Sequence, residues 1–132
     1  MNLAMTHKLH DVGIAKHIGH YSDAVEVATG QRWLYTSGTP GLAADGSIPA
    51  SFEAQTRAAW NGIFAALAAA GMTVADLVKV STSLVSADYI PEYAKIRREL
   101  LGDVKPAFML SIVTQLIKPG ILVEVEVIAA AR

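Results

Sequence analysis

The sequence has no cysteine among its 132 residues, so disulfide bonds, thiolate metal sites and cysteine nucleophiles are excluded. Charge is also scarce, because charged residues make up 17% of the chain where soluble proteins average about 25%. The net charge is −1, and the longest basic cluster is Arg97-Arg98. Proteins that bind nucleic acids usually carry a basic patch, so we expect no nucleic-acid partner.

Long apolar runs are absent as well, since none reaches the roughly 18 residues that a membrane-spanning helix needs. Residues 1–8 lack the apolar core of a signal peptide. We therefore expect a cytoplasmic protein that does not contact a membrane. The length fits a single domain over residues 1–132. Hydrophobic residues make up 52% of the chain, which favours apolar surface buried between subunits over an alanine-rich core alone.

The most informative segment that is present is residues 123–127, where valine and glutamate alternate. Successive side chains of a strand point to opposite faces, so the three valines share one face and Glu124 and Glu126 share the other. The flanking residues are almost all apolar, which predicts a half-buried second face. Buried carboxylates need partners, and a cleft between subunits would supply them.

Two amphipathic helices are predicted. The first begins after Ser51, a good N-cap residue, and ends at Gly71. Its core-facing residues recur at three- and four-residue spacing, and they are Thr56, Trp60, Ile63, Phe64 and Leu67. The second helix covers residues 90–101, with Gly102 ending it.

Period-two patterns predict strands over residues 24–28, 33–36, 77–85, 107–113 and 123–127, with a short strand near 8–11. Residues 29–32 predict a hairpin turn between the strands at 24–28 and 33–36, and residues 37–41 are interpreted as a loop. This order predicts an α+β domain, with a sheet of five to six strands and two helices on one face.

Four local motifs occur in a fixed order along the chain. They are residues 18–25 (I-G-H-Y-S-D-A-V), 36–38 (T-S-G), 55–57 (Q-T-R), and 105–107 (K-P-A) with 123–129 (V-E-V-E-V-I-A). Together they resemble the RidA/YjgF family, also described as liver perchloric-acid-soluble protein-like. The corresponding family motifs read I-G-P-Y-S-x-A-V, V-S-G, P-A-R-S and V-E-I-E-A-I-A, and the match covers about residues 17–130.

The resemblance implies a chorismate-mutase-like fold and a homotrimer with ligand sites in the clefts between subunits. Active members of the family hydrolyse reactive enamine or imine metabolites to keto acids and ammonia. Carried over to this chain, Glu124 would help to place the attacking water, and Tyr21, Ser37 and Gly38 would line the pocket. We expect neither a cofactor nor a metal.

One position departs strongly from the family pattern, because Phe108 stands where the deaminases have arginine. That arginine clamps the substrate carboxylate through charge-assisted hydrogen bonds, which are worth about 1.5–3 kcal/mol. Lys118, in the loop before the last strand, is a poor substitute, because it carries a point charge on a flexible stem. Tyr93 stands roughly where several members have asparagine, and Leu110 alternates with Phe108 toward an apolar cleft. We therefore expect ordinary 2-imino-acid deaminase activity to be weak or absent.

Several of these residues have two interpretations. Glu124 is either a water-positioning acid or a structural acid paired across the trimer interface, and Glu126 is interpreted as structural. His17 and His20 lie three residues apart, but spacing identifies no further metal ligand, so an exposed loop pair is favoured. Alternatively, His20 is a proton-transfer group beside Tyr21, because histidine titrates near neutral pH.

Three functions follow from these residues. The first is hydrolytic deamination of an enamine or imine that lacks the usual carboxylate anchor. The second is a non-catalytic trimer that binds a small metabolite. The third is the endoribonuclease or translation-inhibitor role attached to the family by name, which ranks last because the chain has no basic groove.

Overall fold

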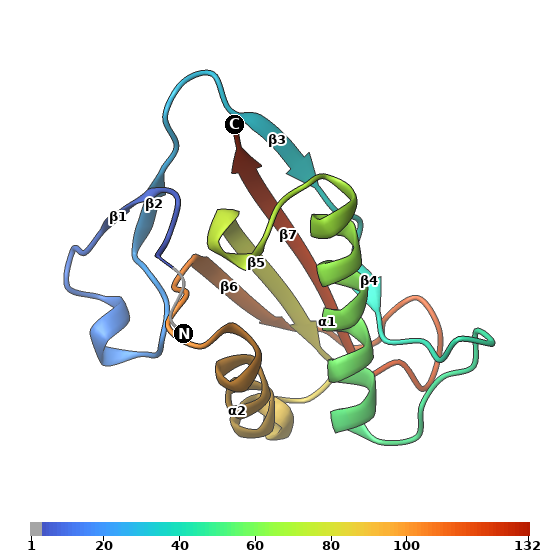
Figure 1. Ribbon diagram of the computed structural model, residues 1–132. Coiled ribbons are helices and arrows are strands. Elements are labelled where there is room, and N and C mark those ends of the chain that lie inside the picture. The colour runs from blue at the N-terminus through green and yellow to red at the C-terminus, as the bar shows by residue number, and fades with distance from the viewer. Residues whose placement is uncertain (1–3) are drawn as a thin grey trace.

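The computed structural model describes residues 4–132, in which two helices pack on one face of a mixed sheet (Figure 1). The strands are β1 Lys8–His10, β2 Ala24–Glu26, β3 Arg32–Tyr35, β4 Thr39–Pro40, β5 Leu77–Leu84, β6 Ala107–Ile112 and β7 Val123–Ala131. The helices are α1 Phe52–Ala69 and α2 Ile90–Leu101, and short 3₁₀ turns occur at Ala15–His17, Val74–Asp76 and Ala87–Tyr89.

The main sheet has the strand order β3-β7-β5-β6, and β4 also pairs with β7. Strands β5 and β6 are parallel and are joined through α2, whereas β7 pairs with β3, β4 and β5 in antiparallel fashion. The prediction of an α+β fold with two helices on one face is therefore confirmed. The main sheet contains five strands, at the lower end of the predicted range.

Helix α1 forms where its N-cap and apolar stripe predict it. The Ser51 hydroxyl accepts a hydrogen bond from the Ala54 N–H at 3.1 Å, which satisfies one of the free donors of the first turn. The predicted stripe faces the sheet, with Thr56, Trp60, Ile63 and Leu67 fully buried and Phe64 packed at the edge of the core. Gly71 has φ +70°, a left-handed conformation that suits glycine after a helix end.

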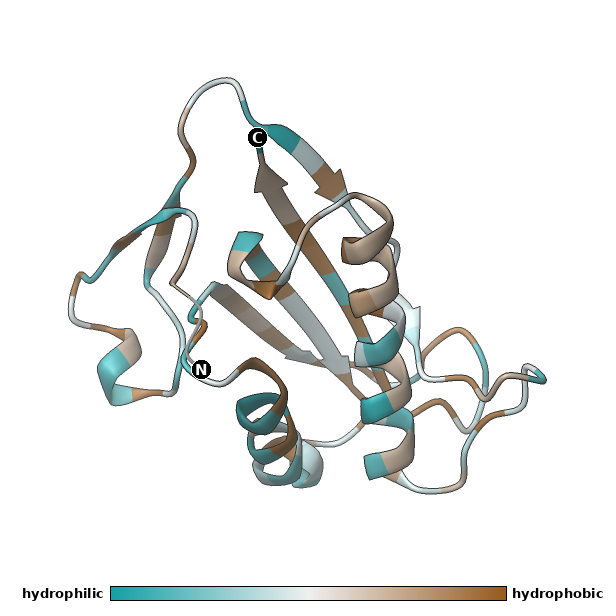
Figure 2. Cartoon of the chain, viewed as in Figure 1, coloured by the Kyte–Doolittle hydropathy of each residue, from teal (hydrophilic) through white to brown (hydrophobic). Residues whose placement is uncertain are grey.

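Strand β7 alternates as its sequence predicts, and Figure 2 shows hydrophobic and hydrophilic bands along it. Val123, Val125 and Val127 are buried beneath the helices, Glu124 is half-buried, and Glu126 is exposed. Because β7 lies between β3 and β5, its register fixes which side chains of those strands face the helices. The strand therefore organises both faces of the sheet.

Two predictions for the N-terminal strands are wrong. Strand β2 does not form a hairpin with β3: it pairs with β1 in a separate two-stranded sheet, and β3 pairs with β7. The loop prediction at 37–41 missed β4, which adds to β7. The turn residues give only a local signal, whereas β3 is held by distant contacts, because Leu34 packs against the core opposite Ala129.

Candidate functional site

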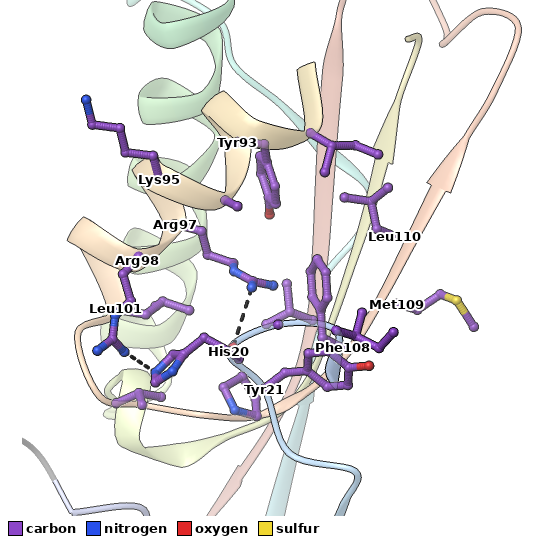
Figure 3. A pocket seen from close by; sticks show the side chains of 17 residues that line it. His20, Tyr21, Tyr93, Lys95, Arg97, Arg98, Leu101, Phe108, Met109 and Leu110 are labelled. Carbon is purple, nitrogen blue, oxygen red and sulfur yellow. Dashed lines mark hydrogen bonds between the residues drawn. The ribbon is translucent and has the colours of Figure 1, made fainter. Parts of the chain in front are cut away.

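A cavity of about 680 Å³ lies between α2, β6 and residues 18–21 (Figure 3). Four of the predicted ligand-binding residues line it: Tyr21, Tyr93, Phe108 and Leu110. They come from three segments that are far apart in the sequence. The structure brings these four side chains together, whereas Ser37 and Gly38, the other two predicted ligand-binding residues, do not line this cavity.

The segment that carries Tyr21 is fixed by hydrogen bonds to the chain just before β6. The Ser22 N–H donates to the Pro106 carbonyl at 3.1 Å, and the Ser22 hydroxyl donates to the Lys105 carbonyl. These bonds hold the Tyr21 ring 6.1 Å from the Phe108 ring. The Tyr21 hydroxyl makes no hydrogen bond within residues 4–132, so it can serve a ligand.

Tyr93 is a buried wall of the cavity more than a polar ligand-binding group. Its hydroxyl shares a hydrogen bond with the Thr82 hydroxyl, and burial raises the pKa of the Tyr93 phenol. Its ring lies nearly parallel to the Phe108 ring, with centroids 6.4 Å apart. The polar atom of Tyr93 is therefore already satisfied, and its ring shapes the cavity.

Arg97 of α2 also points into this cavity, and sequence reasoning missed it. Its guanidinium carbon lies 3.8 Å from the centroid of the Phe108 ring, in cation–π contact. The side chain is only 9% exposed. A signal was available, because Arg97 lies four residues after Tyr93 and four before Leu101, on the buried stripe of the helix.

His20 faces Arg98 rather than the centre of the cavity (Figure 3). Its Nε2 accepts a hydrogen bond from the always protonated Arg98 guanidinium. Burial and the neighbouring Arg98 charge both lower the pKa of the His20 imidazole. The ring is therefore neutral at pH 7 with its Nε2 occupied, which weakens the interpretation of His20 as a proton-transfer group.

The other predicted site residues lie on the opposite face of the sheet. Glu124 lies on β7, and its register partners on the neighbouring strands are Ser83 of β5 and Pro40 of β4. A Cβ atom on Gly38 would lie 1.9 Å from Oε1 of Glu124, so glycine at this position leaves room for the carboxylate in its present orientation. Ser37 is exposed beside it.

Gln55 fixes the chain that leads into the Glu124 strand. Its side-chain amide donates to the carbonyls of Pro49 and Gly120 at 3.0 and 2.8 Å, and its carbonyl accepts from the Leu122 N–H at 2.8 Å. The side chain is fully buried. This explains the structural role of the Q-T-R motif at the start of α1, because it sets where β7 begins.

Comparison with known proteins gives the family. The sequence profile of the endoribonuclease L-PSP family matches residues 14–131. The chain belongs to this family, which is the RidA/YjgF family. No curated protein matches the sequence significantly.

Solved Rid-family structures share the whole fold of this chain. A Rid-family protein of unknown function, YyfB from Yersinia pestis, is 27% identical over 96% of this chain and 100% of its own, with a TM-score of 0.82. RidA from an Antarctic Psychrobacter species is 30% identical over 86% of this chain and 90% of its own, with a TM-score of 0.72. A YjgF-family member from Mycobacterium tuberculosis is 28% identical over 96% of this chain and 100% of its own, with a TM-score of 0.68.

As a Rid-family member, this chain divides its predicted site between two faces. Phe108 and Leu110 point toward the helices, whereas Glu124 points to the face that no helix covers. One protomer alone therefore does not bring Glu124 to the cavity. Within residues 4–132 no group of three or more metal-ligating side chains is present, and no helix there is long and apolar enough to cross a membrane.

Proposed function

We propose that this Rid-family protein is a cytoplasmic homotrimer that hydrolyses imine or enamine metabolites in clefts between its subunits. In this arrangement the cavity of one protomer receives Glu124 and Gly38 of a neighbour. The division of the predicted site between two faces is the observation that carries the proposal. Each half has free polar groups that only a second copy of the chain would bring together.

The helix-free face of the sheet has the character of a subunit interface. Its edges carry exposed large side chains, with Trp33 50% exposed, Tyr35 68% exposed and Met109 55% exposed. Its centre is polar, with Ser83 and Glu124 half-buried. A closed ring of three copies would cover these side chains on every protomer.

The chemistry assigns separate roles to the two halves. A water molecule held by Glu124 adds to the carbon of the C=N bond, and the carboxylate takes its proton. Glu124 returns this proton to the nitrogen, which completes a neutral carbinolamine. The hydroxyl proton then passes to the amino group as the C–N bond breaks, which gives a carbonyl compound and ammonia and leaves Glu124 ionised. An enamine first takes a proton on carbon to form the imine. The Tyr21 hydroxyl is free to bind the substrate on the cavity side.

A non-catalytic trimer that binds a small metabolite is the second candidate, and Phe108 favours it. With phenylalanine at this position, the chain lacks the strand arginine that anchors the substrate in the deaminases. The cavity would then bind a metabolite without hydrolysing it. The two candidates differ in one measurable property, which is release of ammonia from imines formed in the assay from phenylalanine or leucine.

Mixed trimers test whether one site uses two protomers. Leu110→Trp fills the cavity, and Glu124→Gln removes the acid, so each variant alone should lose most of the imine hydrolysis. If each site combines two neighbouring protomers, random mixed trimers of the two variants should regain about a quarter of the wild-type activity.

A control mixture and a thermal melt accompany this experiment. Unfolding temperatures identify any variant that fails to fold, and a mixture of Leu110→Trp with itself must stay inactive after the same refolding. Absence of any regained activity in verified mixed trimers would contradict the shared site. Absence of turnover by the wild type would instead favour the binding trimer.

A further inference from the structure

We propose that Arg97 is the anion-binding residue of the cavity between α2 and β6, and that its ligand is a monocarboxylate with a bulky apolar or aromatic body. The inference rests on the proposed function only in taking this cavity as the ligand site. It supplies what the sequence left open, which is how a Rid-family site without the strand arginine could hold an anionic ligand.

The charge of Arg97 is buried without a counter-ion. The side chain is 91% buried, and none of the ion pairs within residues 4–132 involves it. Its Nη2 donates one long hydrogen bond, 3.4 Å, to the His20 carbonyl. Burial lowers the pKa of the Arg97 guanidinium, but arginine remains protonated at neutral pH. A buried charge is costly unless it is paired, so an anion would stabilise this side chain.

The orientation of Arg97 leaves its donors available. The guanidinium carbon lies over the Phe108 ring, 3.8 Å from its centroid, and a ring face accepts no N–H···O hydrogen bond. The N–H groups of a guanidinium lie in its plane, and they match the two oxygens of a carboxylate. Apart from the bond to His20, these groups have no hydrogen-bond partner in the part of the chain that the structure describes. A carboxylate can therefore bind edge-on while Phe108 holds the cation in place.

The remaining charges around the cavity also favour an anion. Its charged lining residues are Lys95, Arg97 and Arg98, and no carboxylate lines it. Arg98 is occupied by His20, the Gly102 carbonyl and the Asp103 carboxylate. In Figure 3 Lys95 extends away from the labelled cluster, whereas Arg97 reaches toward Phe108. Arg97 is thus the cation that is placed to contact a ligand directly.

The rest of the cavity is apolar, and this determines the body of the ligand. Aliphatic and aromatic side chains form most of its wall, including Ile90, Leu101, Val104, Pro106 and Leu110. A volume of about 680 Å³ exceeds what a small substrate such as a three-carbon imino acid requires. A phenyl or branched aliphatic group would bury apolar area there, which favours binding.

The positions of Phe108 and Arg97 are related in this arrangement. The family places its cation on the strand, whereas this chain has an aromatic ring at that position and a cation on the facing helix. The cation therefore enters the cavity from α2 rather than from β6. The ligand carboxylate should lie correspondingly closer to α2, which leaves the apolar lining residues for the ligand body.

Equilibrium binding of phenylpyruvate to the full-length protein tests the inference without requiring turnover. Calorimetric titrations should show phenylpyruvate and phenylacetate binding, with the neutral isostere phenylacetamide bound about 10-fold more weakly or worse. Arg97→Met keeps most of the side-chain volume and removes the charge. It should weaken phenylpyruvate binding about 10- to 100-fold and leave phenylacetamide binding nearly unchanged.

Two further variants keep the test decisive. Arg97→Lys retains the charge but not the planar fork, and it should weaken binding to an intermediate degree; it also replaces Arg97→Met if that variant does not fold. Arg57→Met is the matched control, because Arg57 lies on α1 in exposed ion pairs with Glu53 and Glu99. It should leave phenylpyruvate binding unchanged.

Equal affinity of wild type and Arg97→Met for phenylpyruvate would overturn the inference, as would equal binding of phenylpyruvate and phenylacetamide by the wild type. Arg97-dependent binding without imine turnover would support the inference and contradict only the hydrolase proposal. Turnover that does not depend on Arg97 would support the hydrolase and overturn the anion site. The two proposals can therefore fail separately.

Discussion

The two faces of the sheet differ in the charged groups that they present. On the helix side, the cavity holds cations and aromatic rings and has no carboxylate in its lining. On the helix-free side, Glu124 is half-buried beside Gly38, and no hydrogen bond or ion pair within residues 4–132 involves its carboxylate.

Under the two proposals, ligand binding and water activation use separate surfaces of one chain. Arg97 and Phe108 would bind an anionic apolar ligand in the cavity. Glu124, which lies close to Gly38 on the opposite face, would supply the acid to a neighbouring protomer. Changes on the two faces should therefore affect different quantities, with ligand affinity governed by one and turnover by the other.

Glu124→Gln should have the largest effect on turnover. General acid–base groups contribute about 10²- to 10⁴-fold to rate, so kcat for imine hydrolysis should fall by that factor while the Kd of phenylpyruvate changes little. Glu126→Gln is the matched control on the same strand and face, and it should leave kcat near the wild-type value. An equal loss in both variants would show that the effect is not specific to Glu124.

Gly38→Ala should have the next largest effect on turnover. It tests whether Glu124 must be held in place, without removing any charge. The added methyl group would lie 1.9 Å from Oε1 of Glu124 in its present position, so the carboxylate must move. Misplacement by about 1 Å can cost up to 10²-fold in rate, so we expect kcat to fall about 10- to 100-fold. Steady-state kinetics and a thermal melt measure this, and unchanged kcat in a folded variant would argue against a positioned Glu124.

Phe108→Arg should reduce stability and fail to restore an ordinary deaminase site. It removes the cation–π contact and sets a second guanidinium against Arg97, which should lower the free energy of unfolding by about 1–2 kcal/mol. In the Arg97→Met background the same change should cost less, by a coupling of about 1 kcal/mol. Denaturant unfolding of the four proteins in this cycle gives the coupling, and its absence would mean that the two residues are independent.

His20 should give the smallest effect, on the pH dependence of stability. Its folded-state pKa lies below the unfolded value because of burial and Arg98. The unfolded chain therefore binds a proton more readily, and the contribution of His20 is present above about pH 6.5 and lost as pH falls through the folded-state pKa. The unfolding temperature of His20→Gln should vary less than that of the wild type between pH 7 and pH 5, and identical pH profiles would contradict this.

Local pattern was enough to predict the elements that carry the core. The stripe of Trp60, Ile63 and Leu67 predicted α1, and the alternation through Val123 and Val125 predicted β7, because an element that is buried on one face has a periodic pattern of apolar residues. These patterns, together with four short motifs, were sufficient to identify the family and the fold.

Tertiary pairing was less predictable. Strand β3 joins β7 through contacts almost one hundred residues apart, such as Arg32 with Ala131, and a turn signal at residues 29–32 cannot reveal such a partner. Arg97 escaped notice because it belongs to a helix, whereas the family pattern directs attention to the strand position of Phe108. Its spacing from Tyr93 and Leu101 indicates burial, whereas its contact with the Phe108 ring becomes visible only when α2 is placed against β6.

A crystal structure of the protein with phenylpyruvate would show whether the ligand lies between Arg97 of one protomer and Glu124 of another. We predict a trimer in which the ligand carboxylate contacts the edge of the Arg97 guanidinium and the keto carbon faces Glu124 of a second protomer. A ligand bound away from Arg97, or an assembly in which no Glu124 reaches any cavity, would contradict this prediction.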